Sequence, residues 1–155
     1  MGTPSELDAD AHRRLGIDLF NKTWTLMEKS ARTPEDDDEM LHCAHSSAYH
    51  WLHAGTAANR ARSEWQCSRV YCVLGRAEPA LHHARRCLEI VEAAPGEMEE
   101  WDLPFAYEAL ARAYAAAGDE AQSRAWLARA RDAGENIGEE DDRALLESDL
   151  ETIGT

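Results

Sequence analysis

Two stretches decide the fold of this chain: residues 64–90, EWQCSRVYCVLGRAEPALHHARRCLEI, and residues 105–131, FAYEALARAYAAAGDEAQSRAWLARAR. They align on two helix-breaking glycines, Gly75 and Gly118, and in each stretch a tyrosine stands four residues before the glycine. Small and apolar residues recur at helical spacing on both sides, and a glycine just past the last periodic residue is a common helix stop. Each stretch is therefore predicted to form two helices joined by a tight turn.

Helical periodicity extends over the rest of the chain, which shows no alternation of the kind that marks a strand. The sequence predicts an all-α fold in a single domain over residues 1–155, with about seven helices, and residues 1–7 are expected to be disordered. Short turns between helices favour antiparallel neighbours. The expected elements are three hairpins over residues 8–55, 59–93 and 104–136, followed by an amphipathic capping helix over 139–153.

The two aligned stretches resemble the tetratricopeptide repeat (TPR) family, whose helix-turn-helix units carry a tyrosine in the first helix and a glycine at the turn. The matching residues are Tyr71, Gly75, Ala80, Cys87 and Leu88 in one unit, and Tyr114, Gly118, Leu127 and Ala130 in the other. The resemblance covers roughly half of the chain. It implies a short stack of hairpins in which each unit covers the apolar face that its neighbour leaves open.

Composition describes an ordinary globular chain with a strongly acidic balance. The 155 residues are 44% hydrophobic and carry a formal net charge of −14, which would repel the phosphate backbone of a nucleic acid. Neither a membrane-spanning run nor a secretory signal is recognisable, and the cysteines Cys43, Cys67, Cys72 and Cys87 form no C-x-x-C pair. The sequence therefore predicts a cytoplasmic protein that binds neither nucleic acid nor membrane, with free thiols.

The predicted second helix, within residues 33–53 (TPEDDDEMLHCAHSSAYHWLH), holds four of the seven histidines. Thr33 and Pro34 are typical of a helix start. An E-x-x-H pattern, with a further histidine three residues on, places a carboxylate and two imidazoles within reach of one divalent transition metal. Two histidines of the predicted fourth helix would complete the site if that helix lies near. The candidate ligands are Glu39, His42, His45, His82 and His83.

A metal-free pocket is the other use of this histidine-rich surface, because aromatic, imidazole and charged side chains together suit a small polar ligand. The candidate binding residues are Tyr49, His50, His53, Asn59, Arg62, Glu64, Trp65 and Arg69. Asp102 and Glu108 are further polar residues expected to converge with them. A purely structural interpretation stays open, in which these residues satisfy each other's hydrogen bonds between packed helices.

The resemblance implies a binding function, since TPR proteins commonly hold peptides in the groove lined by the first helix of each hairpin. Some clamp a terminal carboxylate with Lys, Asn and Arg, and Asn59, Arg62 and Arg69 match in residue type while the lysines are missing. The sequence thus favours a binding module for a small polar ligand or short peptide. The alternative is a small metal-dependent protein or enzyme, whose metal would activate water or a substrate. A homodimer is a third hypothesis, formed through apolar edges around Trp101, Phe105 and Trp126.

Overall fold

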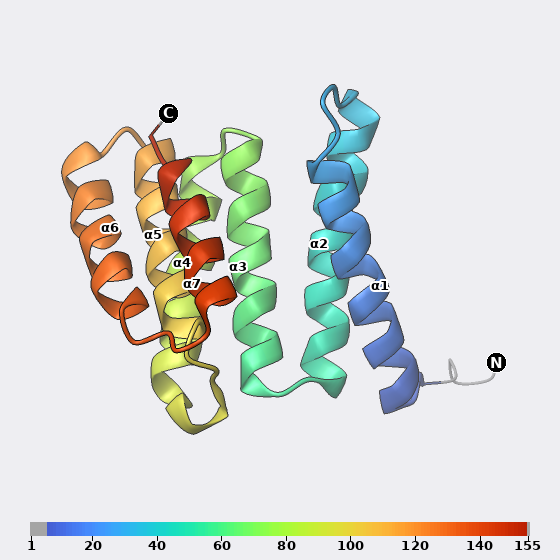
Figure 1. The fold of residues 1–155 in the computed structure, drawn as a ribbon. Coiled ribbons are helices and arrows are strands. Elements are labelled where there is room, and N and C mark those ends of the chain that lie inside the picture. The colour runs from blue at the N-terminus through green and yellow to red at the C-terminus, as the bar shows by residue number, and fades with distance from the viewer. Residues whose placement is uncertain (1–5, 155) are drawn as a thin grey trace.

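Seven α-helices and one short 3-10 helix make up the computed structural model, which describes residues 6–154 (Figure 1). No strand occurs within that range, so the all-α prediction with seven helices is confirmed. The helices are α1 (Ala9–Met27), α2 (Pro34–Ala54), α3 (Ala57–Val73), α4 (Ala77–Ala93), α5 (Asp102–Ala116), α6 (Glu120–Gly134) and α7 (Glu140–Glu151), with η1 (Pro95–Glu97) before α5. Of the segment 1–7 predicted to be disordered, residues 1–5 lie outside the described range, and Glu6 and Leu7 are exposed ahead of α1.

The helices pack as three antiparallel hairpins, α1 with α2, α3 with α4 and α5 with α6, which stand side by side in one row (Figure 1). Between hairpins, α2 contacts α3 and α4 contacts α5, while the first helices α3 and α5 also touch each other. The stack of helical hairpins predicted from the sequence is therefore the observed arrangement. None of the described helices combines the length and apolar character that crossing a bilayer requires.

The two glycine turns have the same geometry. Gly75 and Gly118 adopt positive φ angles of 72° and 77°, a region that side-chain-bearing residues rarely enter. The N–H that follows each glycine donates to the carbonyl of the preceding tyrosine, Tyr71 at 2.8 Å and Tyr114 at 3.0 Å. This is the helix C-terminal hydrogen bond that a left-handed residue makes possible. The alignment of the two stretches in the sequence thus corresponds to equivalent turns.

Local signals also fix where the helices begin. Thr33 and Asp36 exchange side-chain-to-backbone hydrogen bonds of 3.1 and 3.0 Å at the start of α2, forming a capping box. A second capping box, between Thr56 and Asn59, starts α3 at Ala57, two residues before the predicted hairpin boundary. Asn59 is therefore part of a helix cap.

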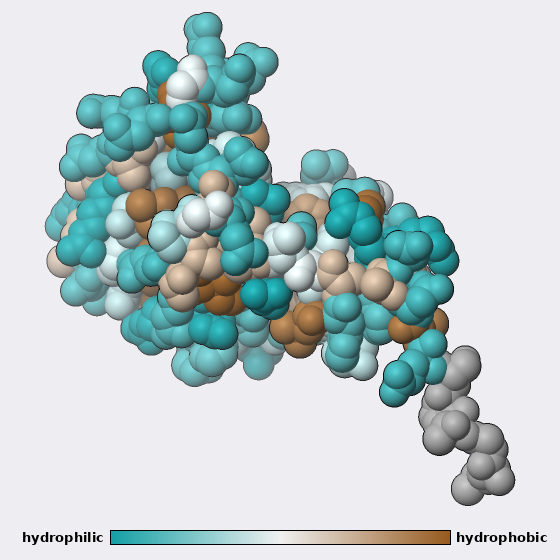
Figure 2. All heavy atoms as spheres, turned by 90° about the horizontal axis from the view of Figure 1, so that it is seen from below, coloured by the Kyte–Doolittle hydropathy of each residue, from teal (hydrophilic) through white to brown (hydrophobic). Residues whose placement is uncertain are grey.

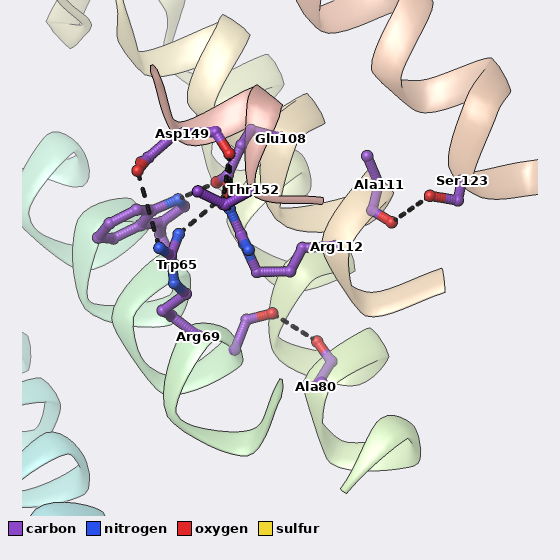
Figure 3. Close-up of polar contacts among 10 residues, drawn as sticks. Trp65, Arg69, Ala80, Glu108, Ala111, Arg112, Ser123, Asp149 and Thr152 are labelled. Carbon is purple, nitrogen blue, oxygen red and sulfur yellow. Dashed lines mark hydrogen bonds and ion pairs between the residues drawn. The ribbon is translucent and has the colours of Figure 1, made fainter. Parts of the chain in front are cut away.

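Small residues let the helices approach closely. An added Cβ at Gly16 would lie 2.8 Å from the Trp51 ring, and the buried Ser47 hydroxyl donates to the Gly16 carbonyl at 2.7 Å. The other two hairpins use one such bond each, Ser68 to the Ala80 carbonyl and Ser123 to the Ala111 carbonyl, both 2.8 Å (Figure 3). Each serine hydroxyl donates to a helix carbonyl oxygen of the same hairpin, and that oxygen has two lone pairs and can accept a second hydrogen bond.

The last helix, α7, packs against the third hairpin, where it contacts both α5 and α6 (Figure 1). Leu146 and Leu150 are buried against Ala130 and Ile137 at the end of the stack. The predicted capping helix thus covers apolar surface of the third hairpin, as expected for the end of a repeat array.

Seen from below, most of the surface is hydrophilic, with hydrophobic side chains in separate patches (Figure 2).

Candidate functional site

A cleft of about 610 Å³ lies between α1, α3, α5 and α7. Both phenylalanines and three of the five tryptophans of the chain line it. Their rings form a continuous row with centroid separations between 5.5 and 6.5 Å, within the usual range for aromatic pairs. In order along the row they are Phe20 and Trp24 from α1, Trp65 from α3, and Phe105 and Trp101 at the start of α5. We call this row and its surroundings the aromatic cleft.

One wall of the aromatic cleft is held by an ion pair between α3 and α5. The Arg62 guanidinium donates to both carboxylate oxygens of Asp102, at 3.0 and 2.9 Å, and lies over the Trp101 ring at 4.2 Å from its centroid. The backbone N–H of Glu99 also donates to Asp102, which caps the turn before α5. Arg62 is therefore neutralised and positioned by its neighbours.

A buried carboxylate links α3, α5 and α7 behind the cleft. Glu108 is 0% exposed and accepts hydrogen bonds from Trp65 Nε1 at 2.8 Å, Arg69 at 3.2 Å and Arg112 at 2.8 Å (Figure 3). Arg69 also lies 3.7 Å from the Asp149 carboxylate of α7, and Arg112 donates to the Asp149 carbonyl at 3.0 Å. This network fixes the indole of Trp65 and holds the last helix against the stack.

Two other carboxylates of the cleft have no such partner. Glu28 lines it from the end of α1 and Asp142 from the first turn of α7. Neither side chain makes a hydrogen bond or ion pair with any residue between 6 and 154. Leu145, 58% exposed, lines the same wall as Asp142. The aromatic cleft thus combines an apolar interior with uncompensated negative charge.

The predicted binding residues are distributed over four places. Arg62, Trp65 and Arg69 line the aromatic cleft, whereas Asn59 lines a smaller hollow of about 140 Å³ beside it. Glu64 is on another side of α3, where its carboxylate lies 2.5 Å from His83 Nδ1. The remaining three, Tyr49, His50 and His53, gather against His12 of α1.

The predicted metal ligands do not assemble into one site. Glu39 forms an ion pair with Lys22 of α1 at 2.6 Å, whereas His45 points toward α3 and α4, with its Nε2 2.8 Å from the Tyr71 hydroxyl. The rings of His45 and His83 do come together, 5.3 Å apart, but His83 is bound to Glu64. His42 and His82 are exposed. In the part of the chain that the structure describes, no group of three or more His, Cys, Asp or Glu side chains is placed to hold a metal ion.

Two histidines of α2 have shifted pKa values for a common reason. Partial burial lowers the pKa of His45, whose ring is packed against Tyr71 although the residue is exposed overall, and His83 adds to the shift. Burial also lowers the pKa of His50, and the neighbouring imidazole of His12, 2.9 Å away between Nδ1 atoms, adds to it. The neutral form of the imidazole is therefore favoured at both His45 and His50.

Several residues of the aromatic cleft were absent from the predicted site. Phe20 and Trp24 lie at helical spacing on α1, and this spacing alone does not distinguish a groove residue from a core residue. Both residues belong to the first helix of the first hairpin, and this position was the signal that could have assigned them to the groove. Nothing in the sequence indicated the contributions of Asp142, Leu145 and Asp149, because they depend on how α7 folds back.

The residues of the dimer hypothesis are also separated. Trp101 and Phe105 line the aromatic cleft, whereas Trp126 on α6 packs against Tyr107 and under the guanidinium of Arg129. These side chains therefore do not form one patch.

Comparison with known proteins identified no relative, because no protein-family model, curated protein or solved structure matches the chain.

Proposed function

We propose that this chain is a TPR-like binding module of the cytosol that holds a short peptide segment in the aromatic cleft. The observation that carries the proposal is the continuous row of five rings from α1 to α5, open at a cleft of about 610 Å³. This volume lies within the range of about 300–1,000 Å³ typical of ligand sites. Clefts lined by aromatic side chains bind partners through a few apolar anchors.

A peptide fits the cleft better than a small polar ligand does. The lining comes from all three hairpins and α7, so the surface extends over several helices. Its polar groups are largely engaged with each other, as in the Arg62–Asp102 pair and the bonds to Glu108. Apolar side chains of a peptide would bury the rings without competing for those hydrogen bonds, whereas a small polar ligand would have to break them.

Selection from a library of random peptides displayed on phage tests this proposal. We expect recovered peptides to be enriched in apolar residues and, once synthesised with a fluorescent label, to bind the purified chain in an anisotropy assay. The variant Leu145→Asn should weaken binding at least tenfold, since it places an uncharged polar amide where an apolar anchor packs. Leu52→Asn is the matched control, because Leu52 is 63% exposed and lies on α2 outside the cleft.

Two results would overturn the proposal. One is a selection that enriches no peptide over immobilised, unrelated protein. The other is a set of peptides whose affinity falls equally in Leu145→Asn and Leu52→Asn, which would assign binding to a general apolar attraction. Circular dichroism of both variants serves as a folding control, and we expect intact helices because each variant replaces an exposed side chain.

A further inference from the structure

We propose that the aromatic cleft selects a basic residue, arginine or lysine, in the bound peptide through Glu28 and Asp142. This inference rests on the proposed function and adds the chemistry of the partner to it. It joins two observations, the two carboxylates without partners and the tryptophan rings that lie along the same cleft.

The charges that line the cleft do not balance. Its two arginines, Arg62 and Arg69, face four carboxylates, of which Asp102 and Asp149 pair with them. Arg69 is further bonded to the buried Glu108, outside the cleft lining. The two carboxylates left over, Glu28 and Asp142, come from different elements, the C-terminal end of α1 and the first turn of α7. A cationic side chain that entered the cleft beside either of them would supply the missing charge, and the net charge of −14 would assist its approach.

The aromatic rings fit the same kind of side chain. Arginine and lysine place their aliphatic stems against apolar surface and their charged groups over the faces of aromatic rings. The cleft already contains one such contact, since the Arg62 guanidinium lies 4.2 Å from the centroid of the Trp101 ring. Trp24 and Trp65, 5.5 Å apart, offer further rings, and Glu28 follows Trp24 by about one helical turn at the end of α1. An arginine of the peptide would find both a stacking surface and a carboxylate there.

An acidic partner is the less suitable alternative. A peptide carboxylate would need a free cation, but Arg62 is held by two hydrogen bonds to Asp102, and Arg69 is bonded to Glu108. Moving Arg62 would leave the buried Asp102 without its cation, and moving Arg69 would remove one of the two arginines that neutralise the buried Glu108, so both changes are unfavourable. Glu28 and Asp142 would in addition repel the incoming anion. The cleft therefore favours a basic side chain over an acidic one.

Three phage libraries of otherwise random peptides, with arginine, glutamine or glutamate fixed at the central position, test this selection. Enriched peptides from each are synthesised together with versions that carry the other two central residues, and affinities are measured by anisotropy. The protein is the full chain, the double variant Glu28→Gln/Asp142→Asn, and the control Glu120→Gln/Asp141→Asn. The control removes the same charge from exposed residues of α6 and α7 that do not line the cleft.

We expect the arginine peptides to bind the full chain about tenfold more tightly than their glutamine versions. That preference should fall below about threefold in Glu28→Gln/Asp142→Asn and stay unchanged in the control variant. An equal loss in both double variants would overturn the inference, because the preference would then reflect net charge alone. Glutamine peptides that bind as well as arginine peptides would also overturn it while leaving the proposed function standing. Absence of binding from all three libraries would overturn both.

Discussion

Replacement of Glu108 by glutamine tests whether the buried network between α3, α5 and α7 stabilises the fold. The carboxylate is completely buried and accepts three hydrogen bonds, two of them from the guanidinium groups of Arg69 and Arg112. Glutamine keeps one acceptor oxygen, but an NH2 group, which donates hydrogen bonds, takes the place of the other oxygen. Whichever way the amide is turned, a donor of the side chain then faces Trp65 Nε1 or an arginine.

The size of the effect follows from these contacts. Each hydrogen bond to a charged group contributes about 1.5–3 kcal/mol, and loss of one partner of a buried ion pair costs about 3–5 kcal/mol. Because Arg69 keeps its contact with Asp149, we expect the lower part of this range, about 3–4 kcal/mol. For 155 residues with an unfolding entropy of about 2.1 cal/mol/K each, this lowers the Tm by about 10 °C.

Urea and thermal denaturation followed by far-ultraviolet circular dichroism measure this loss. Glu147→Gln, on the exposed side of α7, serves as the control and should change stability by less than about 0.5 kcal/mol. A Tm within about 3 °C of the wild-type value for Glu108→Gln would refute the reasoning. It would mean that the arginines find other acceptors at little cost.

Three further changes probe the helix contacts, the turns and the histidines. Gly16→Ala should destabilise by about 2 kcal/mol in urea denaturation, since the new methyl group would lie 2.8 Å from the Trp51 ring; wild-type stability would contradict this close packing. Gly118→Ala should cost about 1 kcal/mol through its positive φ alone, because nothing lies within 4 Å of the added carbon, and an unchanged Tm would argue against the left-handed turn. The folded-state pKa of His50 is lowered from 6.5, so the unfolded chain binds more protons below that pH and stability falls as the pH drops from 6.5 toward the lowered value. His50→Gln should reduce this acid-dependent loss of Tm, and identical pH profiles for variant and wild type would be inconsistent with the shift.

Local sequence signals predicted the fold because helix ends depend on a few neighbouring residues. Gly75 and Gly118 mark their turns, and Thr33 caps α2 as expected. The start of α5 at Asp102 was placed two residues late, at Pro104, because proline can occupy the first turn, where its missing N–H has no helical acceptor. The membership in the TPR family that the sequence suggested stays a prediction.

The binding residues were only partly predictable because they depend on contacts between helices. Arg62, Trp65 and Arg69 share one side of α3, and periodicity alone places them together. The histidines of α2 do not behave in this way. His45 and His50, five residues apart, differ in direction by about 140° on a helix, so one faces His83 and the other His12. The spacing in the sequence predicts that His45 and His50 point in different directions. Which side chains they contact depends on the helices that pack on either side of α2.

The position of α7 has a consequence for attempts to lengthen this protein by design. Twelve residues both finish the array, through Leu146 and Leu150, and supply a wall of the cleft, through Asp142 and Leu145. A hairpin inserted between α6 and α7 would carry that wall outward with the new end. A longer array of this kind would therefore gain length and lose its pocket, unless the inserted unit brought a replacement for the displaced wall.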